Sequence, residues 1–281
     1  MRVAVIQMRS TTSIADNCAT MDELVRKAAD QGATYIQTPE MTGILQKNRK
    51  GLFVEITSQQ DDVLVGHAAD LAEELGIWLH IGSHAVLVDD QKAANRAFLF
   101  SPAGELVTTY DKIHMFDVDL DNGESWRESK VYRPGDRTIV ADTDSARIGL
   151  SICYDVRFPH LYREQALAGA QILSAPAAFT RQTGRAHWHV LMRARAIENG
   201  AFMIAAAQGG DHKDGRETFG HSLVVNPWGE IIAEIKSEEP GFALADIDMG
   251  EVTKARSKIP NLANGREFVI EHISGKAEAV A

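Results

Sequence analysis

The sequence has only two cysteines in 281 residues, Cys18 and Cys153, which excludes a disulfide-rich secreted scaffold. No apolar run approaches the ~20 residues that a membrane-spanning helix needs. Basic residues number 29 against 39 acidic ones, and the net charge of −10 disfavours binding to nucleic acid or to an anionic membrane. The N-terminal stretch MRVAVIQM is too short for a signal peptide. We therefore expect a soluble, cytoplasmic protein with reduced thiols.

Strand-like and helix-like segments alternate along the chain. Strand patterns occupy residues 2–8, 33–38, 77–88, 147–153, 170–179, 201–208 and 241–248. Helical spacing follows Ser13 up to Gly32, recurs at 64–76, from Pro159 to about Gly169 and at 186–198, and a short helix is expected at 250–258. Turn signals at 101–104 and 226–229 indicate two hairpins, and residues 117–137 resemble a long loop. This pattern favours a single α/β domain with two sheets packed between layers of helices.

Three reactive residues follow strand patterns, where α/β sheets open their sites. Cys153 ends RIGLSIC, and a cysteine at a strand-to-helix turn is a candidate nucleophile, although cysteines are more often buried and inert. Glu40 follows Thr38-Pro39 as a candidate general base or a solvated loop carboxylate. Lys112 stands among apolar residues in TYDKIHMFDVD. Its ammonium could lower the pKa of a thiol and neutralise an oxyanion, or lie on the surface.

The segments TPEMTG, YDKIHMFDV and SICYDVRFP, in this order, resemble the nitrilase or carbon–nitrogen hydrolase superfamily. GESWRES, GAQILSAPAAFTRQTGRAHWHVLMRARAIENG, AAAQGG and GHSLVVNPWGE are similar to its Nit branch. The resemblance implies a carbon–nitrogen hydrolase domain over residues 1–250. Residues 251–281 are a C-terminal extension, expected to be an arm at a subunit interface or disordered. The implied fold is a four-layer αββα sandwich that forms a homodimer or a higher homo-oligomer.

The family pattern of a Glu-Lys-Cys triad maps onto Glu40, Lys112 and Cys153. The resemblance implies that Cys153 attacks an amide carbonyl and forms an acyl-enzyme, with Glu40 transferring protons and Lys112 stabilising the oxyanion. No metal or organic cofactor is implied. A second glutamate is common beside this triad and matches Glu128 best, with Glu124 as the weaker candidate. We expect Glu128 to orient Lys112 or the substrate.

Four further residues are candidates for substrate contacts. The backbone N–H of Tyr154 follows the nucleophile and is a second oxyanion donor. Arg157 is either an anchor for a substrate carboxylate or a structural partner of an acid such as Asp155. Phe179 and Thr183 resemble pocket-lining positions of the Nit branch, although Phe179 is equally consistent with the core and Thr183 with a helix cap.

The HWH string of His187 and His189 suggests a metal site at first sight. Alternate positions on a helix point about 200° apart, so the two rings cannot share one ligand face. We therefore expect structural, hydrogen-bonded histidines and no metal ligand.

The resemblance implies hydrolysis of a linear amide of a small carboxylic acid. Deaminated glutathione, cleaved to 2-oxoglutarate and Cys-Gly, is favoured over 2-oxoglutaramate, the substrate of ω-amidases. Hydrolysis of N-carbamyl amino acids or nitriles and acyl transfer to an amine are further alternatives. A non-catalytic interaction protein on the same fold is disfavoured by the intact Glu40, Lys112 and Cys153.

Overall fold

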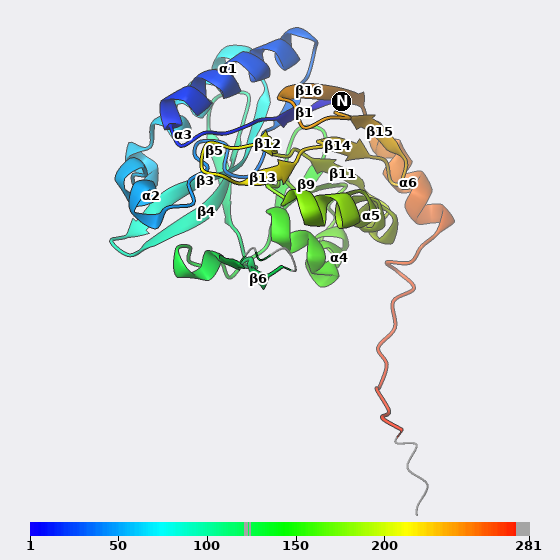
Figure 1. The fold of residues 1–281 in the computed structure, drawn as a ribbon. Coiled ribbons are helices and arrows are strands. Elements are labelled where there is room, and N and C mark those ends of the chain that lie inside the picture. The colour runs from blue at the N-terminus through cyan, green and yellow to red at the C-terminus, as the bar shows by residue number, and fades with distance from the viewer. Residues whose placement is uncertain (121–122, 124, 274–281) are drawn as a thin grey trace, which may run out of the picture.

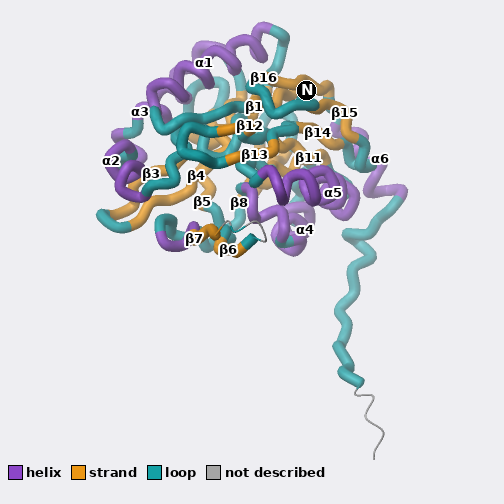
Figure 2. The backbone as a smooth tube through the Cα atoms, viewed as in Figure 1, coloured by secondary structure: helices purple, strands orange, loops and turns teal. Residues whose placement is uncertain are grey.

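The computed structural model describes residues 1–120, 123 and 125–273, and its fold is shown in Figure 1. The α-helices are α1 (Ile14–Asp30), α2 (Arg49–Glu55), α3 (Val63–Leu75), α4 (Pro159–Leu167), α5 (Arg181–Asn199) and α6 (Met249–Lys258). Three short 3-10 helices are η1 (Gln59–Asp61), η2 (Glu128–Lys130) and η3 (Cys153–Arg157). The strands form two large sheets, which Figure 2 shows between the helices.

The first six-stranded sheet has the order β16 (Gly241–Asp246), β1 (Arg2–Gln7), β2 (Tyr35–Gln37), β3 (Trp78–Asp89), β4 (Lys92–Phe100) and β5 (Leu106–Asp111). The second has the order β15 (Ile231–Glu234), β14 (Leu223–Val225), β11 (Phe202–Ala205), β10 (Ile172–Ser174), β9 (Arg147–Leu150) and β8 (Ile139–Asp142). Each sheet has three parallel strands, β1–β2–β3 and β9–β10–β11, flanked by antiparallel ones. Both predicted hairpins are present, as β4–β5 and β14–β15.

Alternation along β1 explains how the first sheet is covered on both faces. Ala4 and Ile6 belong to a buried cluster with residues of α1 and α3, whereas Val3 and Val5 belong to the cluster shared with the second sheet. That second cluster continues through β9–β11 to the buried faces of α4 and α5. Successive strand residues point to opposite faces, so this division produces four layers. The expected αββα sandwich is confirmed (Figure 1).

Two helix boundaries show where local signals succeed and fail. The Ser13 hydroxyl accepts from Asp16 N at 3.3 Å and begins α1, as predicted. In contrast, α5 begins at Arg181, before the expected residue 186, and its N-cap is Thr180. Thr183 is therefore not the cap but the donor of the capping hydrogen bond, through its N–H. The polar first turn is held by tertiary packing, since Gly184 lies directly against the Phe219 ring.

The prediction of one long loop at 117–137 is wrong. It contains a hairpin of β6 (Asp117–Asp119) and β7 (Ser125–Arg127), followed by η2. These strands show no apolar alternation, and polar contacts hold them together instead. Arg127 donates to both Asp119 carboxylate oxygens, at 2.8 and 2.9 Å. A second, smaller ribbon pairs β12 (Gly209–Asp211) with β13 (Glu217–Phe219).

The C-terminal part of the described chain has two different surroundings. Val252 and Ala255 of α6 are buried on the body of the protein. Residues 263–273 have no regular secondary structure, and they extend away from the body in Figure 1. Within the part of the chain that the structure describes, no helix is both long and apolar enough to cross a membrane.

Candidate active site

Glu40, Lys112 and Cys153 meet where loops leave the carboxyl ends of β2, β5 and β9. The three side chains can meet because the two sheets lie close together here, and this close approach requires the glycine at position 82. A Cβ atom on Gly82 would lie 2.1 Å from the Thr38 carbonyl oxygen and 2.4 Å from Pro176 Cβ. Any side chain there would push the Glu40 loop away from the second sheet.

The Glu40 carboxylate is held from both sheets. Its Oε2 accepts at 2.9 Å from Ala178 N, in the segment that follows β10 of the second sheet. Its Oε1 accepts from Lys112 Nζ and Asn95 Nδ2, both at 2.9 Å. The next residue, Met41, has a φ of 56° and donates its N–H to Ser83 Oγ at 2.9 Å, which fixes the turn. The base candidate is therefore buried and rigidly placed.

Lys112 lies between two carboxylates. Besides Glu40, its Nζ bonds Glu128 Oε1 and Oε2 at 3.0 and 2.9 Å. Asn95 Nδ2 also reaches Glu128 Oε1 at 3.1 Å, and Phe116 N donates to Glu128 Oε2 at 2.7 Å. Glu128 thus faces Lys112, as the sequence suggested. Glu124, the weaker candidate, lies outside the described residues.

Cys153 occupies a strained elbow. Strand β9 ends at Leu150, earlier than predicted, and Cys153 begins η3 with a φ of 49°. The buried Asp155 side chain fixes this turn by accepting from Ile152 N at 2.8 Å. It also accepts from Tyr110 Oη at 2.7 Å and from His114 N at 3.1 Å, on either side of Lys112. Asp155 therefore ties the cysteine elbow to the lysine segment.

The three groups have strongly perturbed proton affinities. Burial raises the pKa of the Cys153 thiol well above its usual value, and the adjacent Glu40 carboxylate, toward which the thiol donates, raises it further; Lys112 offsets this only in part. Burial also opposes ionisation of Glu40, but the Lys112 charge and hydrogen bonds from Cys153, Lys112 and Asn95 hold its pKa below the ordinary value. Burial disfavours the Lys112 ammonium, yet Glu128 and Glu40 keep its pKa well above the usual value. The resting site therefore contains thiol, carboxylate and ammonium.

Lys112 acts on the Cys153 thiol in the expected direction and lowers its pKa. Burial and Glu40 outweigh this effect, so the net shift is upward. The helix that follows at once is also only the short η3, and α4 begins at Pro159. Cys153 therefore needs a base to ionise it, and Glu40 is in place for this.

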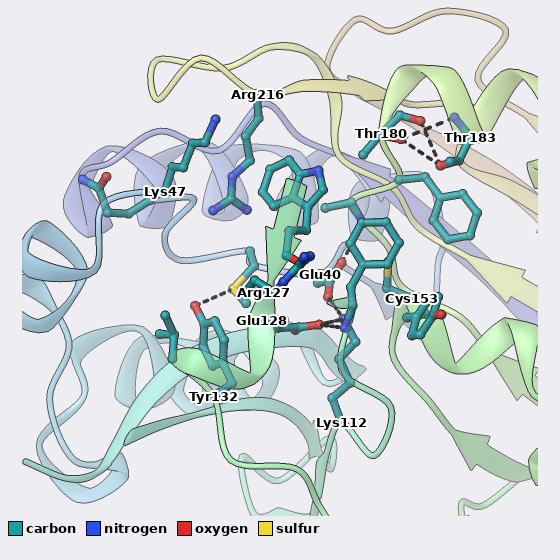
Figure 3. A pocket seen from close by; sticks show the side chains of 18 of the residues that line it. Glu40, Lys47, Lys112, Arg127, Glu128, Tyr132, Cys153, Thr180, Thr183 and Arg216 are labelled. Carbon is teal, nitrogen blue, oxygen red and sulfur yellow. Dashed lines mark hydrogen bonds and ion pairs between the residues drawn. The ribbon is translucent and has the colours of Figure 1, made fainter. Parts of the chain in front are cut away.

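A cavity of about 290 Å³ opens over these residues, and Figure 3 shows many of its side chains. This volume is near the lower end of small-molecule pockets, ~300–1,000 Å³. All four residues proposed for substrate contacts line it: Tyr154, Arg157, Phe179 and Thr183. Phe179 also packs against Trp188, with ring centres 5.0 Å apart, so it belongs to both pocket and core.

Arg157 does not pair with Asp155. Its guanidinium lies 5.3 Å from the Phe179 ring centre, and Nη1 is 3.3 Å from His187 Nδ1. Among the described residues, no carboxylate lies within ion-pair distance of Arg157. The structural alternative involving Asp155 is therefore wrong, and the guanidinium is available to the cavity.

Sequence reasoning missed Asn95, Trp126, Lys47 and Arg216. Asn95 is a fully buried amide in the apolar β4, and a polar residue at such a position was a usable signal. The other three line the cavity from segments far apart in the chain, and no local pattern marks them. The β6–β7 hairpin, which brings in Trp126, was itself not predicted.

The two histidines of the HWH string have different partners, as expected. His187 faces Arg157, whereas His189 Nε2 is 2.8 Å from Glu234 Oε1. His221 Nδ1 is 3.0 Å from the same Glu234 oxygen, so these three side chains are a set with which a metal ion could be held. All three are partly exposed, and none lines the cavity above Cys153.

A buried thiol beside a carboxylate and an ammonium, at the floor of a small cavity, can attack an acyl carbon and transfer protons to a leaving amine. The chain belongs to the carbon–nitrogen hydrolase family, whose model matches residues 2–257. This confirms the resemblance, and the protein is an amidase-type hydrolase of linear amides.

Particular relatives cover almost the whole chain. The deaminated glutathione amidase of Yersinia enterocolitica is 40% identical over 267 residues, 94% of this chain and 92% of that protein. The C. elegans NitFhit protein has a TM-score of 0.87 and 33% identity, covering 94% of this chain and 65% of that one. A mutant amidase from Nesterenkonia sp. AN1 has a TM-score of 0.78 and 25% identity, over 92% and 98% of the two chains. That structure shows Michael addition of acrylamide at the active-site cysteine.

Proposed function

We propose that this enzyme hydrolyses deaminated glutathione to 2-oxoglutarate and Cys-Gly, with Cys153 as nucleophile. The observation that carries the mechanism is the buried arrangement in which the Cys153 thiol faces Glu40, and Glu40 in turn bonds Lys112 at 2.9 Å. The substrate is supported by relatives named deaminated glutathione amidase, including those of Yersinia enterocolitica and Dictyostelium discoideum. The cavity volume suits a small molecule rather than a polypeptide.

In the acylation step, Glu40 accepts the thiol proton while the Cys153 sulfur bonds to the amide carbon. The carbonyl oxygen becomes an oxyanion, which the Lys112 ammonium and the Tyr154 N–H stabilise. Glu40 then gives the proton to the amide nitrogen, the C–N bond breaks and Cys-Gly leaves. The 2-oxoglutaryl group stays on Cys153 as a thioester.

In the deacylation step, Glu40 accepts a proton from water, and the resulting hydroxide attacks the thioester carbon. The C–S bond breaks, 2-oxoglutarate is released and the proton returns from Glu40 to the sulfur. One carboxylate thus acts as base, acid and base again. Its lowered pKa keeps it ionised at neutral pH and ready for the first transfer.

The surrounding residues are assigned roles from their contacts. Glu128 holds Lys112 through two oxygens and orients the ammonium. Arg157 binds the carboxylate of the 2-oxo acid, since its guanidinium lines the cavity beside the elbow. Phe179 and Thr183 shape the same end of the cavity.

The test is 2-oxoglutarate release from deaminated glutathione and from 2-oxoglutaramate, with wild type and Cys153→Ala. Both substrates yield the same product, so one coupled assay compares their kcat/KM values. We expect a preference for deaminated glutathione that the variant abolishes. A preference for 2-oxoglutaramate would reassign the enzyme as an ω-amidase, and activity that survives Cys153→Ala would refute the mechanism.

We also propose that the enzyme works as a cytoplasmic homodimer, with residues 1–250 as the hydrolase domain and the C-terminal extension as an arm on the second subunit. The low cysteine content, two in 281 residues, suits a reducing compartment. Phe268, Val269 and Ile270 are all more than four-fifths exposed, an arrangement that a partner surface would relieve.

A further inference from the structure

The cavity wall carries an excess of positive charge in an acidic protein. Among the described residues, six cationic side chains line the cavity, against the two carboxylates of Glu40 and Glu128. Both carboxylates bond Lys112. The remaining five cations are Lys47, Arg49, Arg127, Arg157 and Arg216. The whole chain has a net charge of −10, so this concentration of cations marks a preference for an anionic ligand.

Not all of these cations are equally available. Arg127 is neutralised by bidentate contact with Asp119 at 2.8 and 2.9 Å. Arg49 donates to the Gln91 carbonyl at 2.8 Å and lies over the Phe53 ring. In contrast, Lys47 has no carboxylate within ion-pair distance among the described residues.

Lys47 and Arg216 converge on one aromatic ring. Lys47 Nζ lies 5.5 Å, and Arg216 Cζ 5.0 Å, from the ring centre of Trp126. Arg216 pairs through Nε at 2.9 Å with the Asp214 side chain, which is only 2% exposed, so its charge is partly offset, but the two terminal nitrogens of its guanidinium are left for other contacts. An anion bound at the rim of this ring would be attracted by both cations.

This cation pair is separated from the nucleophile. Figure 3 shows Lys47 and Arg216 across the cavity from Cys153, while Thr180 and Thr183 lie on the side of Cys153. Arg157, by contrast, is the last residue of η3, the short helix that begins with Cys153. The cavity therefore offers one cationic anchor next to the reacting cysteine and another at a distance.

We propose that Lys47, Arg216 and Trp126 form an anion-binding subsite for the carboxylate of the leaving amine. The inference rests on the proposed function. Deaminated glutathione carries one carboxylate on its 2-oxo acid end and another on its glycine end, with the scissile amide between them. Arg157 takes the first, and the Lys47–Arg216 subsite takes the second. Amides whose leaving group is ammonia have no group for this subsite, so it selects peptide-like amides over 2-oxoglutaramate.

The test combines enzyme variants with a matched substrate pair. Deaminated glutathione is compared with its analogue in which the glycine carboxylate is a carboxamide, using wild type, Lys47→Met, Arg216→Met and the double variant. Lys50→Met is the control, because Lys50 is an exposed cation of α2 that does not line the cavity. The readout is the ratio of kcat/KM for the carboxylate over the carboxamide, with KM and kcat reported separately.

In wild type we expect this ratio to be roughly 30 or more, and each single variant to lower it by roughly fivefold, the scale of one partly exposed charge-assisted contact. The double variant should bring it close to one. The change should lie in KM, because the subsite is remote from the bond that breaks. Lys50→Met should keep the wild-type ratio, and added salt should lower the ratio in wild type more than in the double variant.

The outcomes separate the subsite from the proposed function. If wild type hydrolyses deaminated glutathione but accepts the carboxamide equally well, the subsite is refuted and the function stands. The same conclusion follows if Lys47→Met and Arg216→Met impair both substrates equally, since that pattern reports a damaged wall. If wild type releases 2-oxoglutarate only from 2-oxoglutaramate, both the proposed substrate and the subsite are refuted.

Discussion

Glu40→Gln and Glu128→Gln form a matched pair that separates proton transfer from charge. Each removes one carboxylate whose oxygen lies 2.9 Å from Lys112 Nζ. At an effective dielectric constant of ~20, a charge pair at that distance attracts by about 6 kcal/mol, so both variants disturb Lys112 to a similar degree. Only Glu40, however, faces the Cys153 thiol. A difference between the two variants therefore measures what Glu40 does to the thiol proton.

We expect Glu128→Gln to lower kcat/KM by roughly 10- to 100-fold through a less well-oriented ammonium. Glu40→Gln should lower it by roughly 10³-fold or more, because general acid and base catalysis are lost from both half-reactions. The pH profiles should also differ in shape. The pKa of Glu40 is below its ordinary value, so in wild type the activity should be flat through neutral pH and fall only in acid.

Alkylation of Cys153 by acrylamide gives a second measurement that does not need turnover. In Glu40→Gln the thiol proton has no nearby acceptor and burial still opposes its loss, so the rate of alkylation should be low at neutral pH and rise with pH in the alkaline range as the thiol itself ionises. In Glu128→Gln it should keep the flat profile of wild type. The assays are steady-state kinetics and mass spectrometry of the adduct between pH 5 and 10. Equal losses and equal pH profiles in the two variants would refute Glu40 as the base.

Three further predictions concern stability, positioning and assembly. Burial lowers the pKa of the His80 ring to about 3, so below about pH 6.5 the unfolded chain binds a proton there and the folded chain does not. The unfolding free energy from urea titration should therefore fall by roughly 2 kcal/mol between pH 7 and 5, and His80→Gln should remove this fall. The same pH dependence in wild type and His80→Gln would contradict the prediction. Asp155→Asn should lower the unfolding free energy by roughly 2 kcal/mol and kcat at least tenfold. Both carboxylate oxygens accept hydrogen bonds from N–H or O–H groups, and the amide nitrogen of asparagine cannot act as an acceptor in their place. Thermal melts and kinetics that match wild type would exclude Asp155 as the residue that positions the cysteine elbow. Truncation after Gly265 removes the exposed apolar residues of the tail and should weaken the dimer in sedimentation velocity at low concentration, and an unaltered association constant would refute the arm.

Much of the site could be predicted because its residues follow strong local patterns. Glu40, Lys112 and Cys153 each come after a buried strand, and the carboxyl ends of such strands open at one edge of a sheet. The helix caps at Ser13 and Gly76 depend on neighbouring residues only, and Gly76 indeed ends α3 with a φ of 61°. Family resemblance added what periodicity lacks, namely that three distant loops meet.

The remaining features depend on contacts between distant segments. Trp126 reaches the cavity on a hairpin held by Arg127 and Asp119, and no apolar alternation announces that hairpin. Lys47 and Arg216 converge on it from segments that have no sequence relation. The sign of the Cys153 pKa shift was also beyond the sequence. It is the balance of burial and Glu40 against Lys112, and each of these depends on the folded geometry.

The proton distribution in the site explains why Lys112 has two carboxylate partners. With Glu40 as its only partner, a buried ammonium would depress the pKa of that carboxylate strongly and leave it a poor proton acceptor. Glu128 shares the Lys112 charge through two oxygens, so Glu40 keeps more of its basicity while remaining ionised. In the proposed mechanism, Glu40 becomes neutral when it accepts the thiol proton, and Lys112, still paired with Glu128, then stabilises the oxyanion. Asn95 Nδ2 donates to both carboxylates, at 2.9 Å to Glu40 Oε1 and 3.1 Å to Glu128 Oε1, and so couples their positions.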